Sequence, residues 1–151
     1  MRLEDEIRQT VFGDPFMKAV LNVLVTADRL GAHANATLKP FGLSKEQYNV
    51  LRILRGQHPL PAPLRSVTER MVSRSSNATR LVEKLRAKNL VDRTTCPSNR
   101  RQVDILITAE GLALLDAIDP LMQAGGNATG TLSIEEAEQL NLLLDKMRGT
   151  P

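Results

Sequence analysis

Cysteine and aromatic residues are scarce in this chain of 151 residues, which has one cysteine, one tyrosine and no tryptophan. The single cysteine, Cys96, cannot form an intrachain disulfide, and no Cys/His cluster has the spacing of a zinc site. Aromatic residues make up 3% of the chain, so Leu, Val, Ile, Ala and Met must build the core, which favours helices over a β-sandwich. We therefore expect a mainly helical protein with no metal ion and no cofactor.

Long hydrophobic runs are missing as well. No apolar stretch approaches the roughly 18 residues that a bilayer-spanning helix needs. The first six residues are charged and acidic and lack the apolar core of a secretion signal. We expect a soluble, cytoplasmic protein, and a chain of this length fits one domain with a sizeable core.

Motifs of the common enzyme classes are absent too. The sequence shows no Ser/His/Asp arrangement, no phosphate-binding glycine loop and no metal motif. His33 and His58 stand alone, without neighbouring carboxylates or thiols to complete a metal site. Enzymatic activity is therefore the least favoured function.

Positive charge is concentrated between residues 64 and 101. This segment holds ten Lys or Arg residues against three acids, a net charge of +7, although the whole chain carries only +3. The remainder of the chain is therefore mildly acidic. Such segregated charge indicates a face that binds a polyanion, and DNA is the first candidate.

Helix signals precede the basic segment. Asp14 followed by proline predicts the start of a helix that runs to about residue 38, where a Lys-Pro pair ends it. Ser44 and Gln47 form a capping box that opens a second helix to about residue 56. Three prolines at alternate positions then predict a stiff, non-helical connector.

Helix signals also follow the basic segment. Thr108 is expected to cap a helix that the glycine-rich stretch at 125–130 breaks, and Ser133 with Glu136 forms a second capping box. Apolar helices at both ends of the chain are hard to bury against a small central unit. We therefore expect residues 14–38 and 110–148 to form dimerisation helices around a lobe at residues 41–109.

The basic segment itself is predicted to contain two helices and a hairpin. Apolar residues spaced three and four apart predict a short helix over residues 64–71. Ser73 is expected to cap a longer helix that runs to about Asn89 and presents polar and cationic residues at its first turns. Beyond it, apolar residues alternate between Val103 and Ile107, which predicts a hairpin whose tip carries Arg100 and Arg101.

These motifs resemble those of the MarR family of winged-helix transcription regulators. Residues 73–93 resemble the family's recognition helix and its exit, and residues 99–111 resemble its wing and the start of the next helix. The resemblance covers about residues 14–147. It implies a mainly α fold with a small β-hairpin wing, in which a winged helix-turn-helix is flanked by N- and C-terminal dimerisation helices.

Two positions depart from the family's pattern. Asn99 stands at the wing tip where aspartate is frequent, which weakens an acid–arginine contact there. Asn89 stands where glycine is common, and asparagine tolerates the left-handed backbone that this position requires.

The resemblance also implies a function. It is that of a sequence-specific transcriptional repressor, which binds a pseudo-palindromic operator as a homodimer and is released by a small-molecule effector. The effector would bind between the dimerisation region and the DNA-binding lobe, and no residue identifies it. The alternative is a helical protein–protein interaction module that uses a winged-helix fold without binding DNA.

We assign double-stranded DNA contacts to nine residues. The candidates for base or base-proximal contacts in the major groove are Arg74, Ser75, Asn77 and Thr79. The candidates for phosphate contacts are Ser76, Arg80 and Lys84. The resemblance places Arg101 in the minor groove, with Arg100 on the neighbouring backbone. For Cys96, an incidental exposed thiol is favoured over an oxidation sensor.

Overall fold

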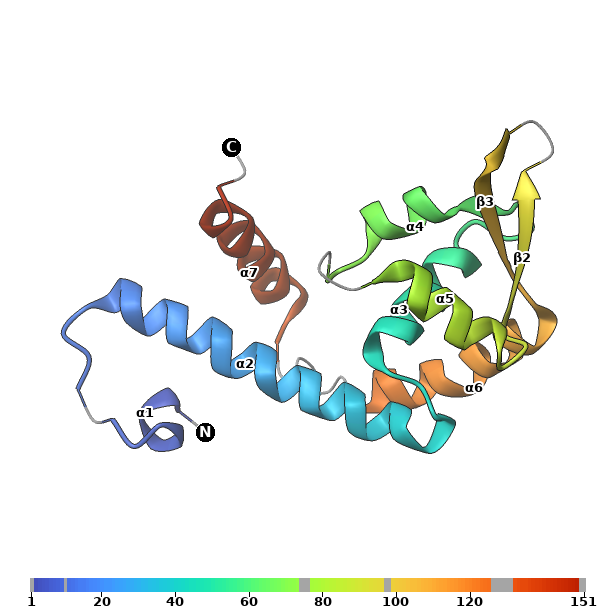
Figure 1. Ribbon diagram of the computed structural model, residues 1–151. Helices are drawn as coiled ribbons and strands as arrows, with labels where there is room; N and C mark the ends of the chain where they lie inside the picture. The colour runs from blue at the N-terminus through green and yellow to red at the C-terminus, as the bar shows by residue number, and fades with distance from the viewer. Residues whose placement is uncertain (1, 10, 74–76, 97–98, 126–131, 150–151) are drawn as a thin grey trace.

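The computed structural model has two parts: a region of terminal helices and a central lobe (Figure 1). It describes residues 2–9, 11–73, 77–96, 99–125 and 132–149, and for residues 95, 96, 99–102, 124 and 125 it describes the backbone alone. The elements, in chain order, are α1 (Leu3–Glu6), α2 (Pro15–Leu38), the 3-10 turn η1 (Lys39–Phe41), α3 (Lys45–Arg55), β1 (Ala62–Pro63), α4 (Leu64–Arg70), α5 (Ala78–Arg86), β2 (Val91–Cys96), β3 (Asn99–Ile107), α6 (Ala109–Gly125) and α7 (Ile134–Met147). We call α1, α2 and α7 the terminal-helix region, and α3 to β3 with α6 as far as Ile118 the central lobe.

Helix α2 begins and ends as its sequence predicts. The Asp14 side chain accepts a hydrogen bond from the backbone N–H of Phe16 at 2.8 Å, and Pro15 takes the first helical position. At the other end the chain tightens into η1 and turns at Gly42, whose φ of 64° is left-handed. This turn brings the chain back toward α3.

Helix α3 opens with the expected capping box. Ser44 Oγ accepts from the Gln47 N–H at 3.2 Å, and Gln47 Oε1 accepts from the Ser44 N–H at 3.0 Å. One face of the helix is buried, including Tyr48, Leu51 and Leu54. This helix is therefore the centre of the lobe, as its apolar stripe predicts.

The described strands form a three-stranded antiparallel sheet in the order β1-β3-β2. The hairpin of β2 and β3, which we call the wing, confirms the predicted one and pairs Val91 with Ile107. Strand β1 was not predicted. It comes from the last two residues of the proline-rich connector, and Ala62 pairs with Ile105. Two residues are too few for an alternation signal, and Pro63 is tolerated because β1 is an edge strand.

A single hydrophobic cluster joins the sheet to the helices of the lobe. It includes Leu51 of α3, Val67 of α4, Leu85 of α5 and Ile105 of β3, each fully buried. Helix α6 contributes Leu115 and Ile118, near its middle, which are also fully buried. Burial of this kind stabilises the lobe by roughly 1.5–3 kcal/mol for each large side chain.

The start of α5 corrects one prediction. The helix begins at Ala78 with Asn77 as its N-cap, so the expectation that Ser73 caps it was wrong. Met71 is already extended, and the Val72 N–H donates to Asn49 Oδ1 of α3 at 3.0 Å. This hydrogen bond spans 23 residues, so it leaves no local signal. It ties the chain just before Ser73 to α3, and α5 begins only at Ala78.

None of the described helices is long and apolar enough to cross a membrane.

Candidate nucleic-acid interface

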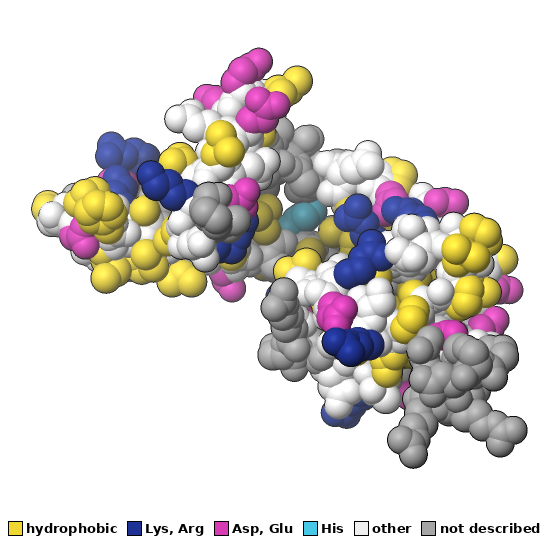
Figure 2. Space-filling model, turned by 90° about the horizontal axis from the view of Figure 1, so that it is seen from above, with side chains coloured by type: hydrophobic (Ala, Val, Ile, Leu, Met, Phe, Trp, Pro, Cys, Tyr) yellow, Lys and Arg dark blue, Asp and Glu magenta, His cyan; other side chains and the backbone are white. Residues whose placement is uncertain are grey.

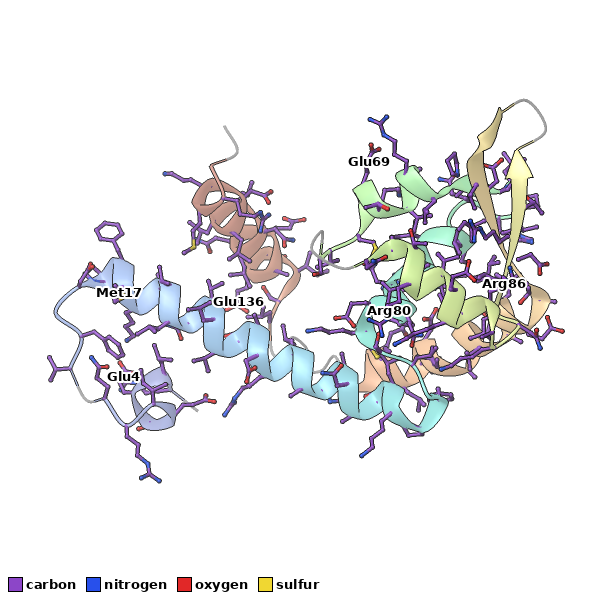
Figure 3. The ribbon with its side chains drawn as sticks, in the orientation of Figure 1. Glu4, Met17, Glu69, Arg80, Arg86 and Glu136 are labelled. Carbon is purple, nitrogen blue, oxygen red and sulfur yellow. The ribbon has the colours of Figure 1, made fainter. Side chains whose placement is uncertain are left out.

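Helix α5 presents a cationic face away from the core. Ala78, Val82 and Leu85 are buried on one side. Arg80 and Lys84 lie exposed on the opposite side, and neither side chain forms an ion pair or hydrogen bond with any described residue. Figure 3 labels Arg80 toward the start of the helix and Arg86 toward its end. Unpaired cations on one helix face are suited to contact phosphates.

Asn77 is the N-cap of α5, a structural role that is separate from the predicted contact with DNA. Its Oδ1 accepts from the Arg80 N–H at 3.0 Å and so caps α5. The side chain remains exposed. With the oxygen engaged, the amide nitrogen is the group that stays available to donate to a base or a phosphate.

The turn from α5 into the wing is fixed by hydrogen bonds to the start of α6. Asn89 has a φ of 58°, which agrees with the left-handed backbone expected there. Thr108 Oγ1 donates to the Asn89 carbonyl at 2.8 Å and accepts from the Gly111 N–H at 3.0 Å. A Cβ at Gly111 would lie 2.4 Å from the carbonyl oxygen of Leu90, so this close approach requires glycine.

The wing extends from this turn with a regular antiparallel register as far as Thr95, where an irregularity precedes Cys96. Arg100 and Arg101 lie in the first part of β3. Their side chains, like that of Cys96, are outside the described part of the structure. The assignment of these arginines to DNA therefore stays a prediction.

An ion pair that the sequence did not predict joins α5 to the wing. Arg93 Nη1 of β2 lies 2.6 Å from Glu83 Oε1 of α5. The two residues are ten positions apart and lie on different elements, so neither helical nor strand spacing relates them. Only the folded turn between them brings them together.

A second unpredicted cluster joins α3 to α6. The Tyr48 hydroxyl donates to Asp119 Oδ1 at 2.8 Å, and Arg55 Nη1 lies 2.7 Å from Asp119 Oδ2. Burial, together with the neighbouring carboxylate, raises the pKa of Tyr48. Burial alone would raise the pKa of Asp119, but the hydrogen bonds from Tyr48 and Arg55 outweigh it and lower that pKa below its ordinary value.

Two hollows flank this cluster. One, of about 320 Å³, lies between α3 and residues 71–73, and the other, of about 270 Å³, lies between α3 and α6. Tyr48 and Arg52 line both, and Lys45 lines the first. Among the described residues, no group of three or more His, Cys, Asp or Glu side chains is placed to hold a metal ion.

The nine predicted DNA-contacting residues divide into three groups. The structure brings four of them together at the start and along the exposed side of α5, namely Asn77, Thr79, Arg80 and Lys84. Arg74, Ser75 and Ser76 lie outside the described residues, and for the two wing arginines the backbone alone is described.

Known proteins are similar to this chain in sequence and in architecture. The model of the MarR family matches residues 43–103, from the start of α3 into β3. The transcriptional regulator MhqR of Bacillus subtilis (strain 168) is 30% identical over 116 residues, which cover 76% of this chain and 79% of MhqR. The chain belongs to the MarR family. It is a DNA-binding transcription regulator with a winged helix, not an enzyme.

Solved structures of MarR-type proteins have the same fold. A MarR transcription factor from Planctomyces limnophilus is 34% identical, with a TM-score of 0.68 over 89% of this chain and 98% of that one. BpsR of Bordetella bronchiseptica is 26% identical, with a TM-score of 0.73 over 83% and 89%. MepR of S. aureus, solved in complex with DNA, is 21% identical and shows the fold alone, with a TM-score of 0.77 over 88% and 97%.

Proposed function

We propose that this MarR-family regulator is a homodimeric repressor that binds a pseudo-palindromic operator and is released by a small-molecule effector. The observation that carries the proposal is the exposed face of α5, on which Arg80 and Lys84 have no partner among the described residues. A B-DNA major groove admits a helix of this kind, and side chains of its first turns reach base edges.

The contacts are proposed from position on the helix and the wing. Asn77 and Thr79, with Arg74 and Ser75 before them, read or approach bases, while Ser76, Arg80 and Lys84 bind phosphates. The wing carries Arg101 into the minor groove and Arg100 along the neighbouring backbone.

Exposed apolar side chains on the terminal helices support the proposal that the partner is a second copy of the chain. On α2, Phe16 is 81% exposed and Leu24 is 59% exposed; on α7, Leu142 is 70% exposed and Leu143 is 57% exposed. Figure 2 shows hydrophobic side chains spread over this part of the surface. A groove of about 630 Å³ between α2 and α7 is lined mainly by apolar residues. Apolar surface of this extent marks an interface, and soluble homo-oligomers are most often two-fold dimers.

The effector is proposed to be a small organic anion that binds beside α3. The two hollows there share Arg52. The hollow between α3 and α6 is also lined by Asp119, which is already paired with Arg55, and the hollow beside residues 71–73 is also lined by Lys45 and Glu46. Met71 and Val72 line the same hollow and lead toward α5, so an occupant would touch the chain that positions this helix. The relative BpsR, whose DNA binding is regulated by 6-hydroxynicotinic acid, supports a ligand of this chemical class.

Selection of bound duplexes from random DNA, followed by fluorescence anisotropy on the best one, tests the proposal. We expect a two-fold-related motif whose half-sites lie about one helical turn apart, and an affinity that falls steeply with salt. Arg101→Ala should weaken binding markedly. Light scattering should give the mass of two chains. If no selected duplex binds better than scrambled DNA, the proposal is wrong, and the protein-interaction alternative gains support.

A further inference from the structure

An acidic side chain, Glu83, lies on the outward side of the otherwise basic helix α5. It follows Arg80 by three residues, which places it about 60° from Arg80 around the helix axis. A carboxylate in this position repels a phosphate backbone. Attraction to DNA therefore does not explain it.

The partner of this carboxylate belongs to the wing. Arg93 Nη1 donates to Glu83 Oε1 at 2.6 Å in a charge-assisted hydrogen bond. Side chains alternate along a strand, so Arg93 shares a face of β2 with Val91, which is buried in the lobe. Arg93 is thus the first residue beyond Val91 on that face, and its ion pair continues the attachment of β2 to α5 beyond the buried Val91 side chain.

We propose that the Glu83–Arg93 ion pair is a brace that fixes the angle between the wing and α5, and that both are positioning residues for DNA binding. The proposal rests on the DNA-binding function proposed above. If α5 binds in the major groove while the wing binds in the minor groove, the two elements must reach the duplex at one fixed separation. A brace between them fixes that separation before DNA arrives and lowers the cost of ordering the wing on binding.

The length of the hairpin makes the angle at its base important. Strand β2 ends at Cys96, three residues beyond Arg93 and so about 10 Å further along the strand. A swing of roughly 10° at the base displaces that end by roughly 2 Å, which is enough to break a hydrogen bond to DNA. The brace acts on this swing because it joins the strand directly to the helix.

The brace is not a major source of folding stability. Of the two side chains, 43% of Glu83 and 37% of Arg93 remain exposed to solvent, and ion pairs so open contribute little to unfolding free energy. Removal of the pair should therefore leave the lobe folded while it frees the wing.

Glu83→Gln tests the proposal because two explanations predict opposite signs. If Glu83 only repels DNA, its neutralisation tightens binding. If it braces the wing, the same change weakens binding to the selected operator by about fivefold, which corresponds to the upper end of an exposed ion pair. Anisotropy titrations at two salt concentrations measure the change, and thermal unfolding checks that the variant folds.

Glu69→Gln is the matched control. Glu69 also pairs with an arginine, Arg65 at 2.8 Å, but both residues lie on α4 and the pair joins no second element. Figure 3 shows Glu69 projecting from α4 away from α5. Its neutralisation should leave affinity unchanged or raise it slightly.

Two further variants show whether the effect passes through the wing. Arg93→Gln should weaken binding, and the double variant Glu83→Gln/Arg93→Gln should bind no worse than Arg93→Gln alone, because the brace is already broken. In an Arg101→Ala background, where the wing contact is lost, Glu83→Gln should no longer weaken binding.

The outcomes separate this proposal from the proposed function. Tighter operator binding by Glu83→Gln, or losses that add in the double variant, would overturn the brace and leave the DNA-binding function intact. Failure of the unaltered protein to prefer any duplex over scrambled DNA would overturn both.

Discussion

The central lobe and the terminal-helix region differ in how completely one chain buries its apolar side chains. In the lobe, Leu51 and Leu85 are fully buried. In the terminal-helix region, Phe16 and Leu142 are 81% and 70% exposed. The lobe thus has a core of its own, whereas the terminal helices have an apolar surface that a single chain does not cover.

Two helices run from the core of the lobe to exposed apolar surface. Helix α2 ends in the core at Leu38, which is fully buried, although most of its length is exposed. Helix α6 begins in the core, where Leu115 and Ile118 are fully buried, but at Leu121 the exposed fraction has risen to 48%. A partner chain that packs on the exposed parts of these helices would also fix the position of the lobe, because the same helices are anchored in its core. In this way a dimer would set the distance between two copies of α5.

Leu51→Ala should cause the largest loss of stability, because it removes a side chain from the core of the lobe. The side chain is fully buried at the centre of the lobe, so its truncation leaves a cavity and should lower the unfolding free energy by about 3 kcal/mol. Leu142→Ala, on the exposed face of α7, is the matched change and should lower the stability of the isolated chain by less than about 0.5 kcal/mol. Urea unfolding at a protein concentration too low for dimerisation measures both, and similar losses would contradict the division into two regions.

Gly111→Ala should strain the contact between the start of α6 and the turn that leads from α5 into the wing. A Cβ there would lie 2.4 Å from the Leu90 carbonyl oxygen and 2.8 Å from Ile107 Cγ1, so the turn below the wing must shift. Overpacking of this kind costs about 2 kcal/mol of unfolding free energy. Gly13→Ala, with no atom within 4 Å of the added Cβ, is the control. Equal thermal unfolding midpoints for the two variants would show that the junction yields without cost.

Leu143→Glu should act on the terminal-helix region alone. This side chain lines the groove between α2 and α7 and is 57% exposed. A buried charge at the proposed interface should weaken dimerisation about tenfold or more, while the lobe stays folded. Asn141→Asp, on the same helix but outside the groove, adds the same charge as a control. Sedimentation at several concentrations measures the dimer, and an unchanged dissociation constant would place the interface elsewhere.

The sequence predicted what depends on local chemistry. The caps at Asp14, Ser44 and Ser133 form as expected, because each cap joins residues two or three positions apart. The wing also follows from a local pattern, namely alternation, and the left-handed backbone at Asn89 agrees with what the family resemblance implied.

The remainder depends on contacts between distant segments. The start of α5 was placed too early because the Asn49–Val72 hydrogen bond, which holds the chain extended, joins two elements. For the candidate site, charge located the basic helix, but the Glu83–Arg93 pair required the folded turn. The apolar periodicity of α2 and α7 led us to expect dimerisation helices, but only the structure identifies which apolar side chains one chain leaves exposed, such as Phe16 and Leu142.

Asp119→Asn should weaken the polar link between α3 and α6 at the point where α6 leaves the core of the lobe. The carboxylate accepts from Tyr48 and pairs with Arg55, so the change should lower the unfolding free energy by about 1 kcal/mol at neutral pH. Because folding lowers the pKa of Asp119, its stabilisation is complete above the ordinary value near 3.8 and is lost as the pH falls through the lower folded pKa. The difference between the unaltered protein and the variant should therefore shrink in acid.

Asp116→Asn is the matched control for that experiment. Asp116 is 78% exposed and lies 3.8 Å from the same arginine, so solvent screens it and little stability depends on it. Urea unfolding at neutral and acidic pH should give a pH-dependent loss for Asp119→Asn and a small, nearly constant one for Asp116→Asn. If both variants behave alike, the link between α3 and α6 is a surface ion pair of no consequence. The part of α6 around Asp119 would then be held against α3 by apolar packing.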